Sequence, residues 1–259
     1  MVKDVNKIEK PSFSKASARK KSAEAIAPSK KTKFSCLPAV LQTMFQSITF
    51  IILFNKNEYM RIKELLKLYP RTYSEELGID LKSGKSEEIF KWFLASILFA
   101  KPIRETSAKK TYFCFLKHGI TSAKKILDTG WNGLVEILDE GGYTRYDFST
   151  ADKLLEVFGN LQKLYNGDLN ILHEKAKDSK DLEERIKELG KGIGETTVSI
   201  FLREMRYCWK KADPKPSPLV KLAMENLKIK DLKKFAQRKK LDLVKLESAL
   251  VRYAKNFLK

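Results

Sequence analysis

Apolar residues recur every three or four positions through almost all of the chain from Met60 onward, and this spacing constrains the fold more than any other feature. It is the period of helices that bury one face. No stretch shows the sustained alternation, bounded by turn residues, that a strand would need. The predicted class is therefore all-α, with many helices that are joined by short connections and packed at varied angles. The predicted helices are Arg61–Leu68, Glu87–Ala100, Thr106–Lys117, Ser122–Leu127, Leu134–Leu138, Thr150–Tyr165, Leu169–Ala176, Leu182–Leu189, Thr196–Trp209, Pro218–Leu227, Leu232–Gln237 and Leu243–Leu258.

The charge of the chain is strongly positive, with 51 Lys and Arg residues against 32 Asp and Glu and a net charge of +19. The region from Met60 to Lys259 has 40 basic and 28 acidic residues, which leaves +12. A protein with this charge attracts polyanions over a long range. Nucleic acid is the first candidate partner and an anionic membrane the second.

The first 59 residues differ in composition from the rest of the chain. Met1–Lys33 has ten basic and three acidic residues among Ser, Ala and Pro, which predicts a disordered basic tail. Phe34–Asn55 is uncharged, and Leu37–Phe54 is mostly apolar, so it could form a membrane anchor. Pro38 and several polar residues interrupt it, whereas a bilayer span needs about 20 consecutive apolar residues. We therefore expect residues 1–59 to be a dispensable extension of a compact helical region over residues 60–259.

Cysteines and histidines are few and scattered. Cys36, Cys114 and Cys208 form no CxxC pair, and His118 and His173 lie far from them and from each other. This spacing disfavours a structural zinc site, a cysteine-ligated iron-sulfur cluster and a disulfide framework. We expect reduced thiols in a cytoplasmic protein, with no bound metal.

A glycine-rich turn joins two predicted helices near the middle of the helical region. Glu183–Leu189 is followed by Lys191-Gly192-Ile193-Gly194, and a second helix runs over Thr196–Met205. The glycines allow positive φ and close backbone approach, and the exposed amides that open the second helix suit an anion. Ile193 would anchor the turn in the core, and Lys191 would add a point charge. The turn can therefore hold one DNA phosphate without reading sequence, although a simple glycine C-cap between two helices would have the same pattern.

The segments on both sides of this glycine-rich turn resemble those of a known protein superfamily. Leu189–Val198, followed by an apolar helix, an Asp and a further amphipathic helix, resembles the endonuclease III-type superfamily of helix-hairpin-helix DNA glycosylases. Phe93–Ala100 resembles the apolar helix that opens the family's core, and Gly141–Leu155 resembles its glycine turn and long helix. The resemblance spans Ile89–Leu227, and only the hairpin is specific.

The resemblance implies a two-lobed fold whose hairpin-bearing lobe covers about residues 105–205, with DNA in the cleft between the lobes. A nucleotide would be flipped into the cleft at a cost of a few kcal/mol, which phosphate contacts would offset. The residues that it implies for the DNA phosphate are Lys191, Gly192, Ile193, Gly194, Glu195 and Thr196. Those implied for contact with DNA or a base are Lys101, Tyr143, Arg145 and Tyr146.

The catalytic carboxylate has two candidate positions. Breaking the bond between base and sugar develops positive charge on the sugar, so the site needs a carboxylate. Asp213 lies 17 residues after Thr196, close to the family's spacing between the hairpin and its Asp. If the following helix is kept in register instead, Ser217 takes that position, with Pro218 as the first helical residue. A turn-forming Asp before Pro would also explain Asp213.

Three further expectations come from the resemblance. Thr196 occupies the position of the Schiff-base Lys of the family's bifunctional members, which implies a monofunctional enzyme without lyase activity. Lys228–Lys259 contains no cysteine, so the family's iron-sulfur loop is missing, and the basic run at Arg238–Lys240 belongs to a solvated or DNA-facing surface. A monovalent cation at the hairpin is compatible with the family pattern, and no other cofactor is expected.

The resemblance thus implies a monomeric base-excision DNA glycosylase, which we expect to act on double-stranded DNA in the cytoplasm, associated with nucleoid or chromatin. One alternative is a noncatalytic DNA-binding protein on the same fold. Another is a helical interaction protein anchored in a membrane through Leu37–Phe54. Trp92 and Trp209 are expected in the core, because their helical spacing is more typical of packing than of base stacking.

Overall fold

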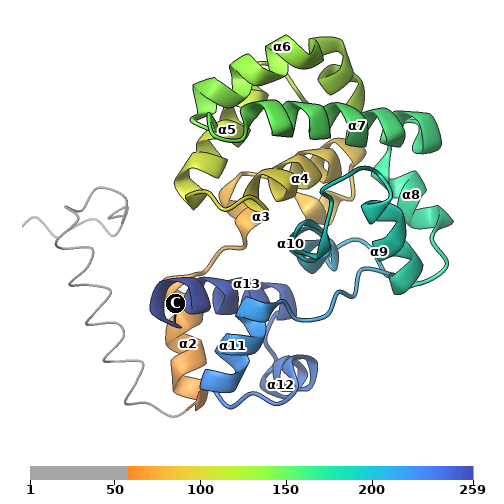
Figure 1. Cartoon of the computed structure of the whole chain (residues 1–259). Helices are drawn as coiled ribbons and strands as arrows, with labels where there is room; N and C mark the ends of the chain where they lie inside the picture. Colours follow the sequence, from red (N-terminus) through yellow and green to blue (C-terminus); the bar gives the residue numbers. More distant parts are fainter. Residues whose placement is uncertain (1–57, 259) are drawn as a thin grey trace, which may run out of the picture. The chain divides into compact units, whose positions relative to one another are not determined.

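The structure, a computed structural model, describes residues 58–258, and all regular structure in this range is helical (Figure 1). The all-α prediction is confirmed. The predicted basic tail and the apolar segment Leu37–Phe54 lie outside the described residues. Among the helices that are described, none has the length and apolar character needed to cross a lipid bilayer.

The helices follow one another through short connections. Their bounds are α2 (Glu58–Leu68), α3 (Tyr73–Glu76), the 3-10 turn η2 (Leu81–Ser83), α4 (Ser86–Phe99), α5 (Glu105–Lys117), α6 (Ala123–Gly141), α7 (Asp147–Tyr165), α8 (Leu169–Lys175), α9 (Ser179–Lys187), α10 (Glu195–Met205), α11 (Pro218–Asn226), α12 (Leu232–Lys239), α13 (Leu243–Tyr253) and the π-helical η3 (Ala254–Leu258).

Helix α4 lies at the centre of the larger group of helices and packs against α5, α8 and α10. Its apolar run is buried because aromatic rings from three helices meet there. Phe93 contacts Phe158 of α7 at 6.0 Å and Phe201 of α10 at 4.9 Å between ring centroids, both edge to face. Trp92 is fully buried, and its indole N–H donates to the Phe201 carbonyl at 3.0 Å. The core position predicted for Trp92 is confirmed, and this packing fixes α10 against α4.

Helices α6 and α7 form the most extensive pairing of the fold. Within α6, Gly130 has φ +67° and ψ 176°, so the segment consists of two helical pieces joined at a kink. The sequence predicted two separate helices here, Ser122–Leu127 and Leu134–Leu138; in the structure both extend toward each other and only Gly130 interrupts them. A glycine suits the kink because other residues are strained at positive φ.

A second group of helices unites the beginning and the end of the described chain. Helix α13 packs against α2, α11 and α12. It also meets α10 through Glu204, a fully buried carboxylate that accepts hydrogen bonds from the Tyr73 and Ser74 amides at 3.1 and 2.9 Å. The Ser248 hydroxyl of α13 donates to the same carboxylate at 3.2 Å. One buried acid therefore connects α3, α10 and α13.

Trp209 is buried, as the sequence predicted, and lies shortly after the end of α10. Its ring stacks on His173 at 4.7 Å, and its N–H donates to Asn170 Oδ1 at 2.8 Å.

Cys114 is a buried thiol and Cys208 a half-buried one, with burial raising the pKa of Cys208 to about 11. Cys36 lies outside the described residues.

Candidate nucleic-acid interface and active site

The predicted hairpin is the connection between α9 and α10, which we define as Leu189–Gly194. Helix α9 starts at the N-cap Asp178, and Leu189 and Ile193 are both buried. The Ile193 amide donates to the Gly190 carbonyl at 3.2 Å, which closes the turn. Gly192 has φ +82°, a backbone conformation that residues other than glycine rarely adopt. The connection is therefore a tight turn fixed at both ends by apolar side chains.

Helix α7 supports this connection with three polar side chains on one face. Lys153 Nζ donates to the Gly192 carbonyl at 2.9 Å. Glu156 accepts from the Lys191 amide at 3.1 Å, and Asn160 Nδ2 donates to the Leu189 carbonyl at 2.9 Å. These residues were missed at the sequence level. Their spacing of three and four is the signal that could have indicated a shared helical face.

The start of α10 is open to solvent. Gly194 is its N-cap and has no side chain to accept from the first amides, while Glu195 and Thr196 are exposed. The first turn of a helix carries unpaired N–H groups and partial positive charge, which together suit an anion. The Glu195 carboxylate is engaged by Lys187 of α9, and the Lys191 amide is already used by Glu156. The amides of α10 and the exposed Lys191 side chain therefore offer the donors for a phosphate.

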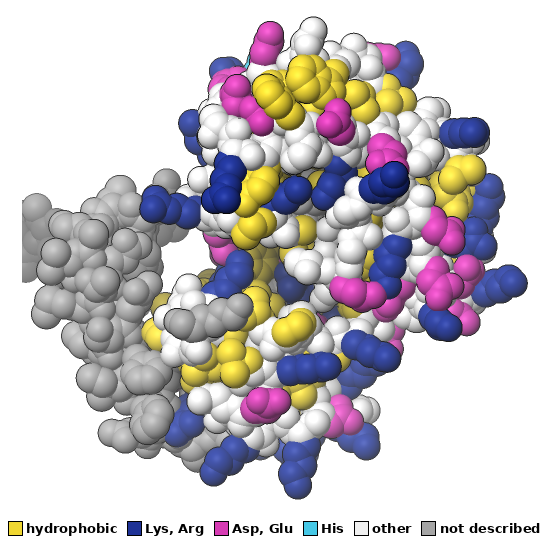
Figure 2. Space-filling view, viewed as in Figure 1, with side chains coloured by type: hydrophobic (Ala, Val, Ile, Leu, Met, Phe, Trp, Pro, Cys, Tyr) yellow, Lys and Arg dark blue, Asp and Glu magenta, His cyan; other side chains and the backbone are white. Residues whose placement is uncertain are grey.

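A basic cluster lies close to the connection. Lys101 Nζ and the Arg145 guanidinium lie 5.3 and 5.6 Å from the centroid of the Tyr146 ring. Burial and then the nearby charge of Lys101 lower the pKa of Lys153, the residue that binds the Gly192 carbonyl. The structure thus brings Lys101, Arg145 and Tyr146 together and links them through Lys153 to the turn. Figure 2 shows Lys and Arg side chains spread over the face in view, interspersed with acidic ones.

Tyr143 requires a correction. The resemblance implied an exposed residue that stacks on DNA, but Tyr143 is only 1% exposed. Its hydroxyl donates to the Leu98 carbonyl at 2.7 Å, and desolvation raises its pKa. Tyr143 is therefore a core residue that joins the end of α6 to α4. The sequence did not reveal this, because the pattern Tyr-x-Arg-Tyr after two glycines looks the same whether its first ring points inward or outward.

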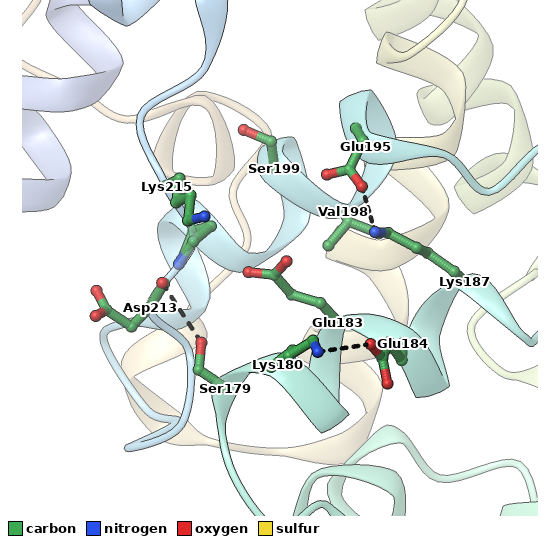
Figure 3. A pocket seen from close by; sticks show the side chains of 11 residues that line it. Ser179, Lys180, Glu183, Glu184, Lys187, Glu195, Val198, Ser199, Asp213 and Lys215 are labelled. Carbon is green, nitrogen blue, oxygen red and sulfur yellow. Dashed lines mark hydrogen bonds and ion pairs between the residues drawn. The ribbon is translucent and has the colours of Figure 1, made fainter.

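A pocket of about 500 Å³ lies between α9, α10 and the segment Asp213–Lys215 (Figure 3). Most of its lining side chains are polar or charged. They are Ser179, Lys180, Glu183, Glu184, Lys187, Glu195, Val198, Ser199, Asp213, Pro214 and Lys215. The candidate carboxylate Asp213 and Glu195, the first residue of α10, thus border the same cavity.

Asp213 is held at the pocket rim by polar contacts. Its carboxylate pairs with Lys233 of α12, and Arg206 Nε lies 3.8 Å from it. The Asp213 side chain is 47% exposed, and Figure 3 shows its carboxylate turned away from the middle of the pocket. The Ser179 hydroxyl donates to the Asp213 carbonyl at 3.4 Å, which ties the segment to α9.

The other candidate position, Ser217, is a helix cap. Its hydroxyl accepts from the Val220 amide at 3.4 Å, and Pro218 is the first residue of α11. This is the N-terminal Ser-Pro arrangement that the second alignment implied. Ser217 does not line the pocket, whereas Asp213 does.

Glu183 of α9 was not among the site residues predicted from the sequence, where it appeared only as part of the helix before the glycine turn. Figure 3 shows its carboxyl directed into the middle of the pocket. Burial raises its pKa, and the charges of Glu195 and Asp213 act in the same direction, while Lys187 and Lys215 oppose them.

In the described part of the chain, no three His, Cys, Asp or Glu side chains are placed to hold a metal ion.

Searches against protein-family models, curated proteins and solved structures each return no match for this chain.

Proposed function

We propose that this protein is a monofunctional DNA glycosylase that grips duplex DNA through the α9–α10 connection and hydrolyses the bond between a displaced base and its sugar. The observation that carries the proposal is the pocket, because the first residue of α10 and Asp213 border one cavity of about 500 Å³. A phosphate at the start of α10 would therefore place its nucleotide next to a carboxylate.

The DNA-binding part of the proposal is supported by the charges around the connection. In residues 61–258, whose side chains are described, Lys101, Arg145, Lys153 and Lys191 form no ion pair with a carboxylate. Cations without counter-charges release bound counterions from DNA when they neutralise phosphates. Lys191 belongs to the turn before α10, Lys153 binds it, and Lys101 lies near enough to Lys153 to lower its pKa. These cations support a surface suited to a phosphate backbone.

The chemical part depends on Asp213. Departure of the base leaves positive charge on the sugar, and a carboxylate at the edge of the pocket stabilises that charge. Thr196, in the first turn of α10, has no amine and so cannot form the Schiff base that a Lys at that position would form. In the proposed reaction the attacking group is water. Asp213 supplies the negative charge in this scheme, so its pairing with Lys233 must loosen and its carboxylate must turn into the pocket when DNA binds.

A noncatalytic DNA-binding protein is the second candidate, and the same pairing favours it. A carboxylate that is 47% exposed and neutralised by Lys233 is typical of a surface ion pair. On this alternative the connection would still hold DNA, while the pocket would perform no chemistry.

Excision by the full chain separates the two candidates. Duplexes carrying uracil, 8-oxoguanine, 3-methyladenine or thymine glycol are incubated with the protein and then treated with alkali, which cleaves abasic sites. Alkali-labile product from at least one duplex supports the glycosylase. Tight binding to every duplex without any product supports the noncatalytic protein. Borohydride trapping addresses the lyase separately, and a covalent adduct would contradict the role given to Thr196.

A further inference from the structure

Glu183 lies on the face of α9 that lines the pocket, five residues after the N-cap Asp178. It is half-buried, whereas Asp213 across the pocket is exposed. Figure 3 shows the Glu183 carboxyl pointing into the cavity and the Asp213 carboxylate pointing out of it. Of the two acids, Glu183 is the one positioned to meet a ligand inside the pocket.

The other charges in the pocket are mostly paired with one another. Lys187 binds Glu195, Lys180 lies 3.8 Å from Glu184, and Asp213 pairs with Lys233. Within the described residues, Glu183 and Lys215 have neither a hydrogen bond nor an ion pair through their side chains. The pocket therefore contains one carboxyl and one ammonium that are free to bind a ligand.

The surroundings of the two carboxyls differ in a way that suits two roles. Asp213 is solvated and faces Lys233 and Arg206. Glu183 is half-buried, with Lys187, Glu195, Lys215 and Asp213 as its charged neighbours, and burial is the main cause of its raised pKa. When two carboxyls in one site have environments that separate their proton affinities, one serves as acid and the other as anion.

We infer that Glu183 is the proton-transferring carboxyl of this pocket, an inference that rests on the proposed glycosylase function. Protonated Glu183 donates its proton to the displaced base as the C1′–N bond breaks and the bonding electrons leave with the base. The resulting carboxylate takes a proton from the water whose oxygen bonds to C1′. The products are the neutral free base and an abasic site, and Glu183 ends protonated as it began.

The test compares excision by the full-length wild type with that of Glu183→Gln, Glu183→Asp and Glu188→Gln. Glu188 is an acid at the end of the same helix that does not line the pocket, so Glu188→Gln is the matched control. Loss of a general acid lowers the rate by roughly 10²–10⁴-fold. We expect a loss of that order for Glu183→Gln, partial recovery in Glu183→Asp, and wild-type affinity for DNA in all three.

The pH dependence provides a readout that a purely structural role would not change. The acid must be protonated, so the wild-type rate should fall as the pH rises through the raised pKa of Glu183. Glu183→Gln should lose this descending limb. Excision at the wild-type rate and with the wild-type pH profile in Glu183→Gln would overturn the inference while leaving the glycosylase intact. A wild-type chain that binds DNA but forms no abasic product would overturn both.

Discussion

Lys153 of α7 donates a hydrogen bond to the carbonyl oxygen of Gly192 at 2.9 Å, and this contact joins the most extensive helical pair of the fold to the turn between α9 and α10. Glu156 and Asn160 bind the same turn from the same helix face. The turn is therefore held from outside by α7 as well as from inside by Ile193. Contacts within the protein alone therefore define the shape of the turn.

Replacing Lys153 with methionine keeps the length of the side chain and removes its charge and its hydrogen bond. The hydrogen bond to Gly192 holds the turn in shape, and the ammonium group is a cation that can neutralise a DNA phosphate. We therefore expect weaker binding to every duplex, with the dependence of log K on log salt shallower by about one. The measurement is fluorescence anisotropy over a salt series. Lys163→Met, at an exposed position of α7, is the control, and equal curves for both variants would contradict this role of Lys153.

Gly192→Ala should destabilise the protein more than Gly194→Ala. A Cβ at Gly192 would lie 2.7 Å from Lys153 Cε and would force a side chain into φ +82°, at a cost of about 1–2 kcal/mol. A Cβ at Gly194 meets nothing within 4 Å and needs no positive φ. Urea unfolding of the two variants measures the difference. Equal midpoints would show that the turn tolerates a side chain at Gly192.

Glu204→Ala should cost about 3–5 kcal/mol of unfolding free energy, as removal of one member of a buried charged network typically does. The substitution leaves the Tyr73 and Ser74 amides and the Ser248 hydroxyl without their acceptor. Glu204→Gln retains one acceptor oxygen and should lose less. Glu225→Ala, at an exposed site on α11, is the reference in chemical denaturation. A loss no greater than that of the reference would mean that the network adds little to stability.

The sequence predicted the positions of the helices better than it predicted which side chains are exposed. Apolar spacing located α4 and α7, and the gap around Gly130 matched the kink in α6. It missed α3, a single turn that depends on its capping box and on Glu204, which lies more than 120 residues away. Spacing along a chain carries no information about such a partner.

The sequence likewise predicted some parts of the candidate site and missed others. The glycine pattern located the turn and the burial of Ile193, because both depend on local backbone geometry. The resemblance placed Tyr143 facing the DNA cleft, whereas the structure has a core residue whose hydroxyl donates to the Leu98 carbonyl. The sequence did not single out Glu183, because helical periodicity cannot tell an acid that lines a pocket from one on an open face.

Abasic-site formation by the full chain, measured beside Asp213→Asn, tests the proposed function most directly. Asp128→Asn, at an exposed acid on α6, provides the matched control. We predict alkali-labile product from at least one damaged or mispaired duplex, loss of that product in Asp213→Asn, and wild-type yield in Asp128→Asn. Product at the wild-type rate from Asp213→Asn, or DNA binding by the wild type with no product from any duplex, would contradict the proposal.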